Sequence, residues 1–256
     1  MPALFSADGG SLSLYGPFHL AWILLGVPAA LFIACRLRRL RPKQGQRLLL
    51  LLWAFMAASE IWKQLYLLHL NNGQLQYWYL PFQLCSMPLY LCPVAALARP
   101  GHLKSAVCTF LCGYSLLGGL LTLAFPEDIL SRTAALAWHG MAWHILLIFL
   151  GCWLGLSGWG ADGIVRQRLC GAAAVYLLCA AAALALNFLL WEPSGHDVNF
   201  FYLGPMPSGQ PVFWRITEKY GWLVNLPCYL AAEIVGGSLL ALPFLQKTRR
   251  RVHSHA

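Results

Sequence analysis

Seven long apolar stretches run through the chain, and they limit it to folds whose helices lie in lipid. Each stretch is close to the roughly 20 residues that an α-helix needs to cross a bilayer. Charged residues make up 11% of the 256 residues, whereas soluble domains carry about a quarter. We therefore predict an all-α, polytopic integral membrane protein with seven transmembrane helices. The expected spans are Phe18–Cys35, Leu48–Leu70, Leu80–Ala98, Ser105–Phe125, Ala134–Ser157, Leu169–Trp191 and Gly221–Leu245.

The connections between these spans are short, so a single transmembrane domain is predicted over residues 1–256. The longest connection, Glu192–Tyr220, is too short for a soluble domain. Its aromatic and turn residues are compatible with an outer lid or with a plain interfacial loop. The N-terminus lacks the basic region of a signal peptide, so the first span is expected to be retained.

Basic residues gather in alternate connections and so predict the orientation of the chain. The net charge is +9, and fourteen of the 18 Lys and Arg residues fall on one side of the expected spans. They are Arg36, Arg38, Arg39, Arg41, Lys43, Arg47, Arg99, Lys104, Arg166, Arg168, Lys247, Arg249, Arg250 and Arg251. Because cytoplasmic loops carry an excess of Lys and Arg, we expect a cell-membrane protein with its N-terminus outside and its C-terminus in the cytoplasm. This distribution indicates topology and contact with lipid headgroups, and it argues against nucleic acid as a partner.

The expected third span contains polar groups that are costly in lipid. Within Leu80–Pro93 lie the Gln83 amide, the Cys85 thiol and the Ser86 hydroxyl. Polar side chains in membrane helices usually face the interior of the bundle or a water-filled cavity, and they often carry function. This segment is therefore a candidate chemical site.

Two prolines, Pro88 and Pro93, are expected to disturb the same helix. A proline inside a helix leaves the carbonyl four residues earlier without its partner. Pro88 is thus expected to free the Leu84 carbonyl beside Cys85. Freed backbone groups persist in a membrane only where protein or trapped water satisfies them.

A further polar group lies in the expected span Leu48–Leu70. Glu60 precedes Lys63 by three residues and Gln64 by four, so the three side chains share one helical face. Two interpretations remain open. The group is either an ion pair that fastens this helix to its neighbours, or part of the wall of a polar cavity.

Histidines and asparagines add candidates in two other spans. His139 and His144 are five residues, or about 140° of helix rotation, apart, so both cannot point along one line. Cys85 and His139 are expected at a similar depth, with His144 about 7.5 Å deeper. Asn187 and Asn199 lie at or beyond the outer end of the sixth span and are candidate substrate-binding residues.

These residue types fit acyl transfer by a cysteine and a histidine. The histidine takes the thiol proton, the thiolate attacks an ester or thioester carbonyl, and a second nucleophile takes the acyl group. A thiol in apolar surroundings needs such a base nearby, and Gln83 or a backbone N–H is a candidate donor to the oxyanion. No cysteine pair has a zinc spacing with nearby histidines, so neither a metal nor another cofactor is expected.

At the same segment the chain resembles the YwaF-like family of bacterial integral membrane proteins, which have seven predicted spans. Residues Leu80-Pro81-Phe82-Gln83-Leu84-Cys85-Ser86 match the family's segment L-P-x-[QH]-L-C-[SD]. The likeness extends to further segments along most of the chain. They are Ser59-Glu60, Gly118-Gly119, Pro126-Glu127-Asp128 and the fifth-span histidine, where His144 is best in register.

The YwaF-like family is in turn distantly similar to a vertebrate multispan acyltransferase that remodels ether phospholipids through a cysteine centre. This resemblance implies that Cys85 is the nucleophile and His144 its base. The chain departs from its bacterial relatives in having a second histidine, His139, and in having Ser86 where some relatives have aspartate.

We therefore predict a membrane-embedded lipid acyltransferase or transacylase, with Cys85 as nucleophile and His144 or His139 as base. The expected partners are membrane lipids, with a phospholipid or a lipidated acceptor entering sideways from the outer leaflet. The residues expected to line or orient the substrate site are Gln83, Ser86, Glu60, Lys63, Gln64, Asn187 and Asn199. The alternatives are a small-molecule or ion transporter or channel with a polar pathway, and a structural or assembly protein.

Overall fold

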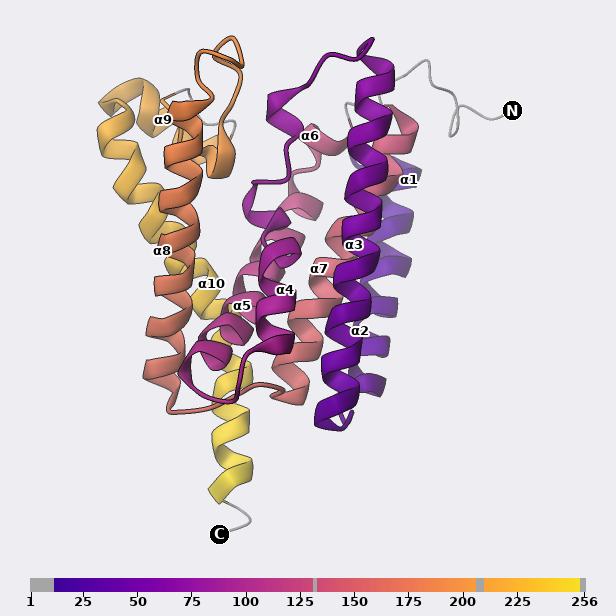
Figure 1. Cartoon of the computed structure of the whole chain (residues 1–256), viewed down its shortest axis with the longest axis vertical. Coiled ribbons are helices and arrows are strands. Elements are labelled where there is room, and N and C mark those ends of the chain that lie inside the picture. Colours follow the sequence, from indigo (N-terminus) through magenta and orange to yellow (C-terminus); the bar gives the residue numbers. More distant parts are fainter. Residues whose placement is uncertain (1–11, 131–132, 206–209, 254–256) are drawn as a thin grey trace.

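The computed structural model describes residues 12–130, 133–205 and 210–253, and in these ranges every regular element is a helix (Figure 1). Six helical segments are long and apolar enough to cross a membrane. They are Pro17–Leu37, built from α1 (Pro17–Ala21), the π-helical turn η2 (Trp22–Gly26) and α2 (Val27–Leu37), then α3 (Pro42–Leu70), α5 (His102–Ala124), α7 (Ala134–Ser157), α8 (Val165–Leu189) and residues Trp222–Gln246 of α10 (Trp222–His253). The prediction of an all-α, multi-pass membrane protein is confirmed.

The expected third span is not one long helix. Its helical part is a 3₁₀ turn, η4 (Leu84–Ser86), followed by α4 (Pro88–Leu97). The fourteen residues Leu84–Leu97 reach only about 21 Å, less than the roughly 30 Å of a bilayer core. Pro88 stands at the start of α4, where a missing N–H costs nothing. The prediction that Pro88 frees the Leu84 carbonyl is therefore wrong, because this carbonyl accepts a hydrogen bond of 3.2 Å from the Met87 N–H.

Helices α5 and α7 form the centre of the bundle. Their apolar windows are 72% and 61% buried, against at most 28% for the other four long segments. Gly119 lets the two central helices approach, since a Cβ there would lie 3.0 Å from the His144 carbonyl. Gly113 of α5 packs directly on the Gly237 carbonyl of α10, a close approach of the kind that small residues permit in membranes.

The two ends of the bundle differ in chemistry. The short connections 38–41, 98–101 and 158–164 lie at the same end as the C-terminus (Figure 1), and the predicted basic residues flank them. The opposite end holds η3 (Tyr77–Tyr79), α6 (Glu127–Leu130), η5 (Phe200–Tyr202) and α9 (Pro211–Tyr220). We call these the basic end and the capped end. The connection Glu192–Tyr220, expected as a lid or a plain loop, therefore contains the helices η5 and α9 and covers the capped end.

Candidate functional site

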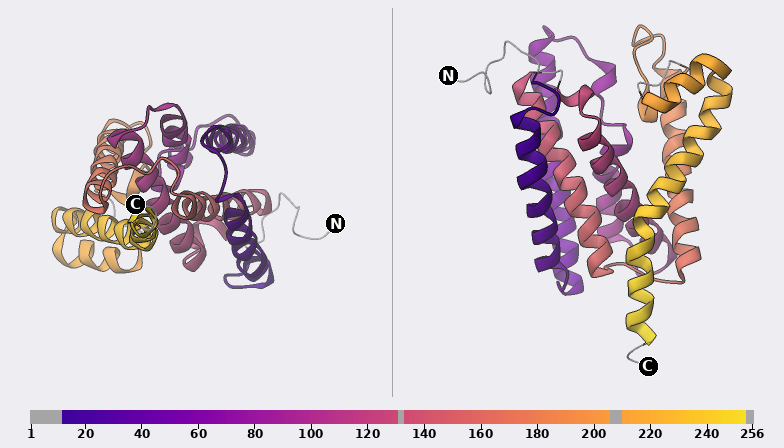
Figure 2. Two further views of the ribbon diagram at one scale, coloured as in Figure 1. Left: turned by 90° about the horizontal axis from the view of Figure 1, so that it is seen from below. Right: turned by 180° about the vertical axis from the view of Figure 1, so that it is seen from behind.

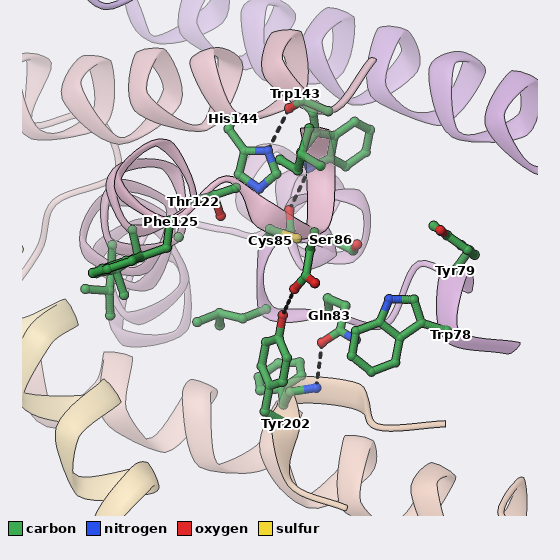
Figure 3. Close-up of a pocket in the computed structure, with 18 of the residues that line it drawn as sticks. Trp78, Tyr79, Gln83, Cys85, Ser86, Thr122, Phe125, Trp143, His144 and Tyr202 are labelled. Atoms are coloured by element: carbon green, nitrogen blue, oxygen red, sulfur yellow. Dashed lines mark hydrogen bonds between the residues drawn. The ribbon is translucent and has the colours of Figure 1, made fainter. Parts of the chain in front are cut away.

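A cavity of about 240 Å³ lies in the half of the bundle nearer the capped end (Figure 3). Its walls come from α3, residues 78–86, α5, α6, α7, η5 and α10. Seven of the ten predicted site residues line it. They are Glu60, Lys63, Gln83, Cys85, Ser86, His139 and His144.

Cys85 is held in this cavity by its backbone. The indole Nε1 of Trp143, on α7, donates a hydrogen bond of 3.0 Å to the Cys85 carbonyl. On α5, Gly118 faces Cys85 so closely that a Cβ at position 118 would lie 3.9 Å from the Cys85 Cβ. The irregular entry into α4 thus places the thiol between α5 and α7, and all nine cysteines of the chain are free thiols.

The imidazole of His144 is oriented by its own helix. Its Nδ1 lies 2.7 Å from the Gly140 carbonyl oxygen. Because a carbonyl only accepts, Nδ1 must carry the proton, and Nε2 of the neutral ring is left as an acceptor. Figure 3 shows His144 and Cys85 among the residues that line the cavity. Within the described ranges, no hydrogen bond joins the thiol to either histidine in this state.

His139 lines the same cavity in a different setting. Its ring stacks between Trp62, at a centroid distance of 5.8 Å, and Trp143, at 5.5 Å. Its Nε2 is buried and has no hydrogen-bond partner among the described residues. The ring also interacts with the Ser59 backbone, and its place between two indoles is typical of a packing residue.

Glu60 and Lys63 form an ion pair at 2.8 Å, with side chains that are mostly buried. The Gln64 amide donates hydrogen bonds of 2.7 Å to both the Glu60 carboxylate and the Tyr79 carbonyl. The group therefore fastens α3 to the segment that leads to Cys85. Since Glu60 and Lys63 also line the cavity and Gln64 does not, the fastening role and the wall role coexist.

The Gln83 amide links the Cys85 segment to the cap. Its Oε1 accepts a hydrogen bond of 2.8 Å from the Phe201 N–H, and its Nε2 donates one of 3.2 Å to the Asn199 carbonyl. Phe201 and Tyr202 have positive φ values of 55° and 54°, which are uncommon for residues other than glycine. Gln83 therefore holds a strained turn against the cavity.

Asn187 and Asn199 support this turn and do not line the cavity. The Phe200 N–H donates a hydrogen bond of 2.6 Å to the Asn187 Oδ1, and the Asn187 Nδ2 donates one of 2.9 Å to the Phe200 carbonyl. The Asn199 Oδ1 accepts a hydrogen bond of 2.7 Å from the Gly204 N–H. Both side chains thus satisfy backbone groups of the cap, so that any effect on a substrate is exerted through the turn.

Two acidic residues that line the cavity were not among the predicted site residues. Asp128 on α6 accepts a hydrogen bond of 2.9 Å from the Tyr202 hydroxyl, and burial together with this carboxylate raises the pKa of Tyr202, which keeps the hydroxyl a donor. Glu233 on α10 is 8% exposed, and its Oε2 has no partner among the described residues. A carboxylate within an apolar run was the signal for Glu233, whereas only the folded cap brings Asp128 inward.

The cavity wall continues to the side of the bundle. Leu121 of α5 and Phe125, which directly follows α5, line the cavity, yet they are 40% and 47% exposed. Helices α5 and α10 meet near Gly113 and Gly237 and diverge toward the capped end (Figure 2). The cavity therefore has an apolar wall whose side chains are partly exposed.

Comparison with known proteins places this architecture in a family. A family model described as the TMEM164 family matches residues 14–242. No curated protein and no solved structure matches the chain. The match covers both central helices, the Cys85 segment and the capped end, and the chain therefore belongs to the TMEM164 family, a family of membrane proteins.

Proposed function

We propose that this protein is a membrane-embedded lipid acyltransferase or transacylase that carries the acyl group as a thioester on Cys85. The observation that carries the proposal is the shared cavity of Cys85 and His144, in which the Nδ1 bond to Gly140 leaves Nε2 free to accept a proton. Apo active sites often hold their catalytic groups farther apart than the reacting complex does. The proposal requires that substrate binding bring the Cys85 Sγ and the His144 Nε2 within hydrogen-bonding distance.

The first half-reaction forms the thioester. His144 Nε2 takes the Cys85 proton, and Sγ attacks the ester carbonyl carbon of the donor lipid. When the tetrahedral intermediate collapses, the C–O bond breaks, and the leaving lysolipid oxygen receives the proton from His144. In the second half, His144 takes a proton from the acceptor hydroxyl, whose oxygen attacks the thioester, and the departing Cys85 sulfur regains that proton.

The oxyanion needs donors close to the nucleophile. The Cys85 backbone N–H lies against its own thiol, in the first turn of η4, where N–H groups have no partner within the helix. The Ser86 hydroxyl also interacts with the thiol. These two groups are our candidates for stabilising the negative charge of the tetrahedral intermediate. The Gln83 Oε1 and one of its two amide donors are already engaged by the cap, which favours a positioning role for Gln83.

The shape of the cavity favours acyl transfer over transport. A transporter or channel needs a path toward both faces of the membrane, whereas the lining residues all belong to the half near the capped end. The apolar wall of Leu121 and Phe125 suits a lipid that enters sideways. With the basic end in the cytoplasm and the N-terminus outside, the irregular Cys85 segment together with α4 would complete a seventh pass of the chain. The donor and acceptor lipids would then come from the outer leaflet of the cell membrane.

The resemblance of residues 80–86 to the YwaF-like family supports the same assignment. That family is distantly similar to a cysteine-centred ether-phospholipid acyltransferase, and the matching positions in this chain include both Cys85 and His144.

The test is comparative lipidomics of cells that express the wild type, Cys85→Ala, or Cys35→Ala as a control at an exposed thiol. The wild type and the control are expected to change the acyl composition of phospholipids in the same way, and Cys85→Ala is expected to match empty cells. Equal lipid profiles for the wild type and Cys85→Ala at equal expression would refute the proposal.

A further inference from the structure

A groove of about 300 Å³ lies between the beginnings of α5 and α8, at the basic end. It shares no lining residue with the cavity around Cys85. Its polar end contains Arg168, His102 and Gln167, and its apolar part includes Ala106 and Val175. The groove is thus amphiphilic, and it has no role in the proposed acyl transfer.

Arg168 is the unusual residue of this groove, because it is a buried charge without a counter-charge. Its side chain is 9% exposed. The guanidinium Nε donates a hydrogen bond of 3.4 Å to the Thr109 hydroxyl. This hydroxyl in turn donates one of 2.7 Å to the Ser105 carbonyl. Neither ion pair found in the described part of the chain involves Arg168. Buried charges are normally paired. The guanidinium of Arg168 is therefore expected to bind an anion that is not part of the chain.

The helix that carries Arg168 adds to this preference. α8 is 25 residues long and begins at Val165, three residues before Arg168. The N-terminus of a long helix carries a partial positive charge and unpaired N–H groups, which favour phosphate and other anions. Arg168 and the helix terminus therefore favour the same kind of ligand.

The apolar part of the groove continues from Arg168 toward the middle of the bundle. Gly171 and Val175 follow Arg168 by three and seven residues and share its helical face. A Cβ at Gly171 would lie 2.8 Å from the Ala106 Cβ, so the two helices are close there and small side chains form the floor. A hydrocarbon chain can lie along this floor while a polar head remains at Arg168.

We propose that this groove binds an anionic phospholipid, with its phosphate on Arg168 and one acyl chain along Ala106, Gly171 and Val175. Basic pockets between membrane helices at the cytoplasmic side are known to take anionic headgroups. A free phosphate ion shares the headgroup chemistry but cannot use the apolar floor. Asp162 is an exposed carboxylate at the polar end, and it opposes the bound phosphate.

The test is native mass spectrometry of the purified full chain in detergent, titrated with dioleoyl phosphatidylglycerol or dioleoyl phosphatidylcholine. The wild type is expected to prefer the anionic lipid. Arg168→Gln should bind it about tenfold more weakly, the loss expected for a charge-assisted hydrogen bond. Arg166→Gln, at an exposed position two residues away, should keep the wild-type affinity. Equal binding by wild type and a folded Arg168→Gln protein overturns the proposal.

Two further arms keep the test decisive. Asp162→Asn removes the opposing charge and should bind phosphatidylglycerol about two- to threefold more tightly, as expected for one partly screened charge. Unchanged binding by Asp162→Asn contradicts the proposal even if Arg168→Gln fails to fold. Inorganic phosphate should not displace the lipid at equal concentration. Displacement would make this a phosphate-ion site and overturn the assignment to a lipid.

Discussion

The indole of Trp143 donates a hydrogen bond of 3.0 Å to the carbonyl oxygen of Cys85. One turn of α7 thereby supplies both the group that fixes the backbone of Cys85 and, at the next position, the proposed base His144. The broken third span is usable as a site because this carbonyl has a partner inside the protein. The relationship also explains how an irregular segment can keep one geometry in a membrane.

Trp143→Phe should destabilise the protein by about 1–3 kcal/mol, the cost of leaving a buried carbonyl without its donor. Phenylalanine keeps an aromatic ring next to His139, and it removes the indole N–H together with part of the buried ring volume. The measurement is the free energy of unfolding in detergent, with Trp53→Phe as a control at an exposed tryptophan of α3. An equal loss in both variants would show that the hydrogen bond to Cys85 contributes nothing specific.

Glu60→Gln should destabilise the protein by about 3–5 kcal/mol, because Lys63 would be left as a buried charge without its partner. The double variant Glu60→Gln/Lys63→Met removes both charges and should recover most of that loss. The same unfolding measurement, applied as a double-mutant cycle, gives the coupling energy of the pair. Additive effects of Glu60→Gln and Lys63→Met would contradict a stabilising ion pair between these two side chains.

Gln83→Leu should release the turn around Phe201, because the Gln83 side chain is hydrogen-bonded to the backbone of both Asn199 and Phe201. Hydrogen exchange is expected to become faster at the Phe201 amide, whose partner is lost, while amides in the centre of α7 stay protected. Asn187→Leu should have the same effect on the Phe200 amide. Unchanged exchange in both variants would exclude the role of these amides in holding the cap.

Gly118→Ala should be tolerated, since its Cβ would meet Cys85 at an ordinary contact distance of 3.9 Å. Gly118→Leu should fill the space beside the thiol and slow alkylation of Cys85 by about tenfold. A tenfold lower rate corresponds to a free-energy barrier to alkylation that is about 1.4 kcal/mol higher. Peptide mass spectrometry after maleimide labelling measures this rate separately from the other eight cysteines. Equal labelling in the Ala and Leu variants would mean that position 118 does not face the reactive thiol.

Six of the seven expected spans agree with long helices because a run of about 20 apolar residues leaves few other solutions in lipid. The third expected span differs because a proline inside a predicted helix is read as an interruption, whereas Pro88 is the first residue of α4. Apolar composition reports that a segment is buried in lipid. It does not report where within the segment the helix begins, and this start decides the placement of Cys85.

The polar residues of the site were partly predictable for the same reason. A thiol, a carboxylate or a histidine inside an apolar run is expected to face the interior, so an inward place for Cys85, Glu60 and His144 was predictable from the sequence. The preference for Cys85 among nine cysteines and for His144 over His139 came from the family resemblance. Whether a side chain touches the cavity or the backbone of the cap depends on loop geometry. That is why Asn187 and Asn199 proved to be supports of the turn, and why Asp128 and Tyr202 were missed.

The central claim is that Cys85 carries the acyl group, and a thioester trapped on this residue tests it most directly. The purified protein is reconstituted with phospholipid of defined chains and no acceptor, quenched in acid and digested. Mass spectrometry should find the Cys85 peptide acylated and sensitive to hydroxylamine. His144→Asn should reduce this adduct by about a hundredfold or more, as expected for loss of a general base. An unmodified Cys85 peptide from this acceptor-free reaction, in a wild-type preparation that transfers acyl chains once an acceptor lysolipid is added, would contradict the account.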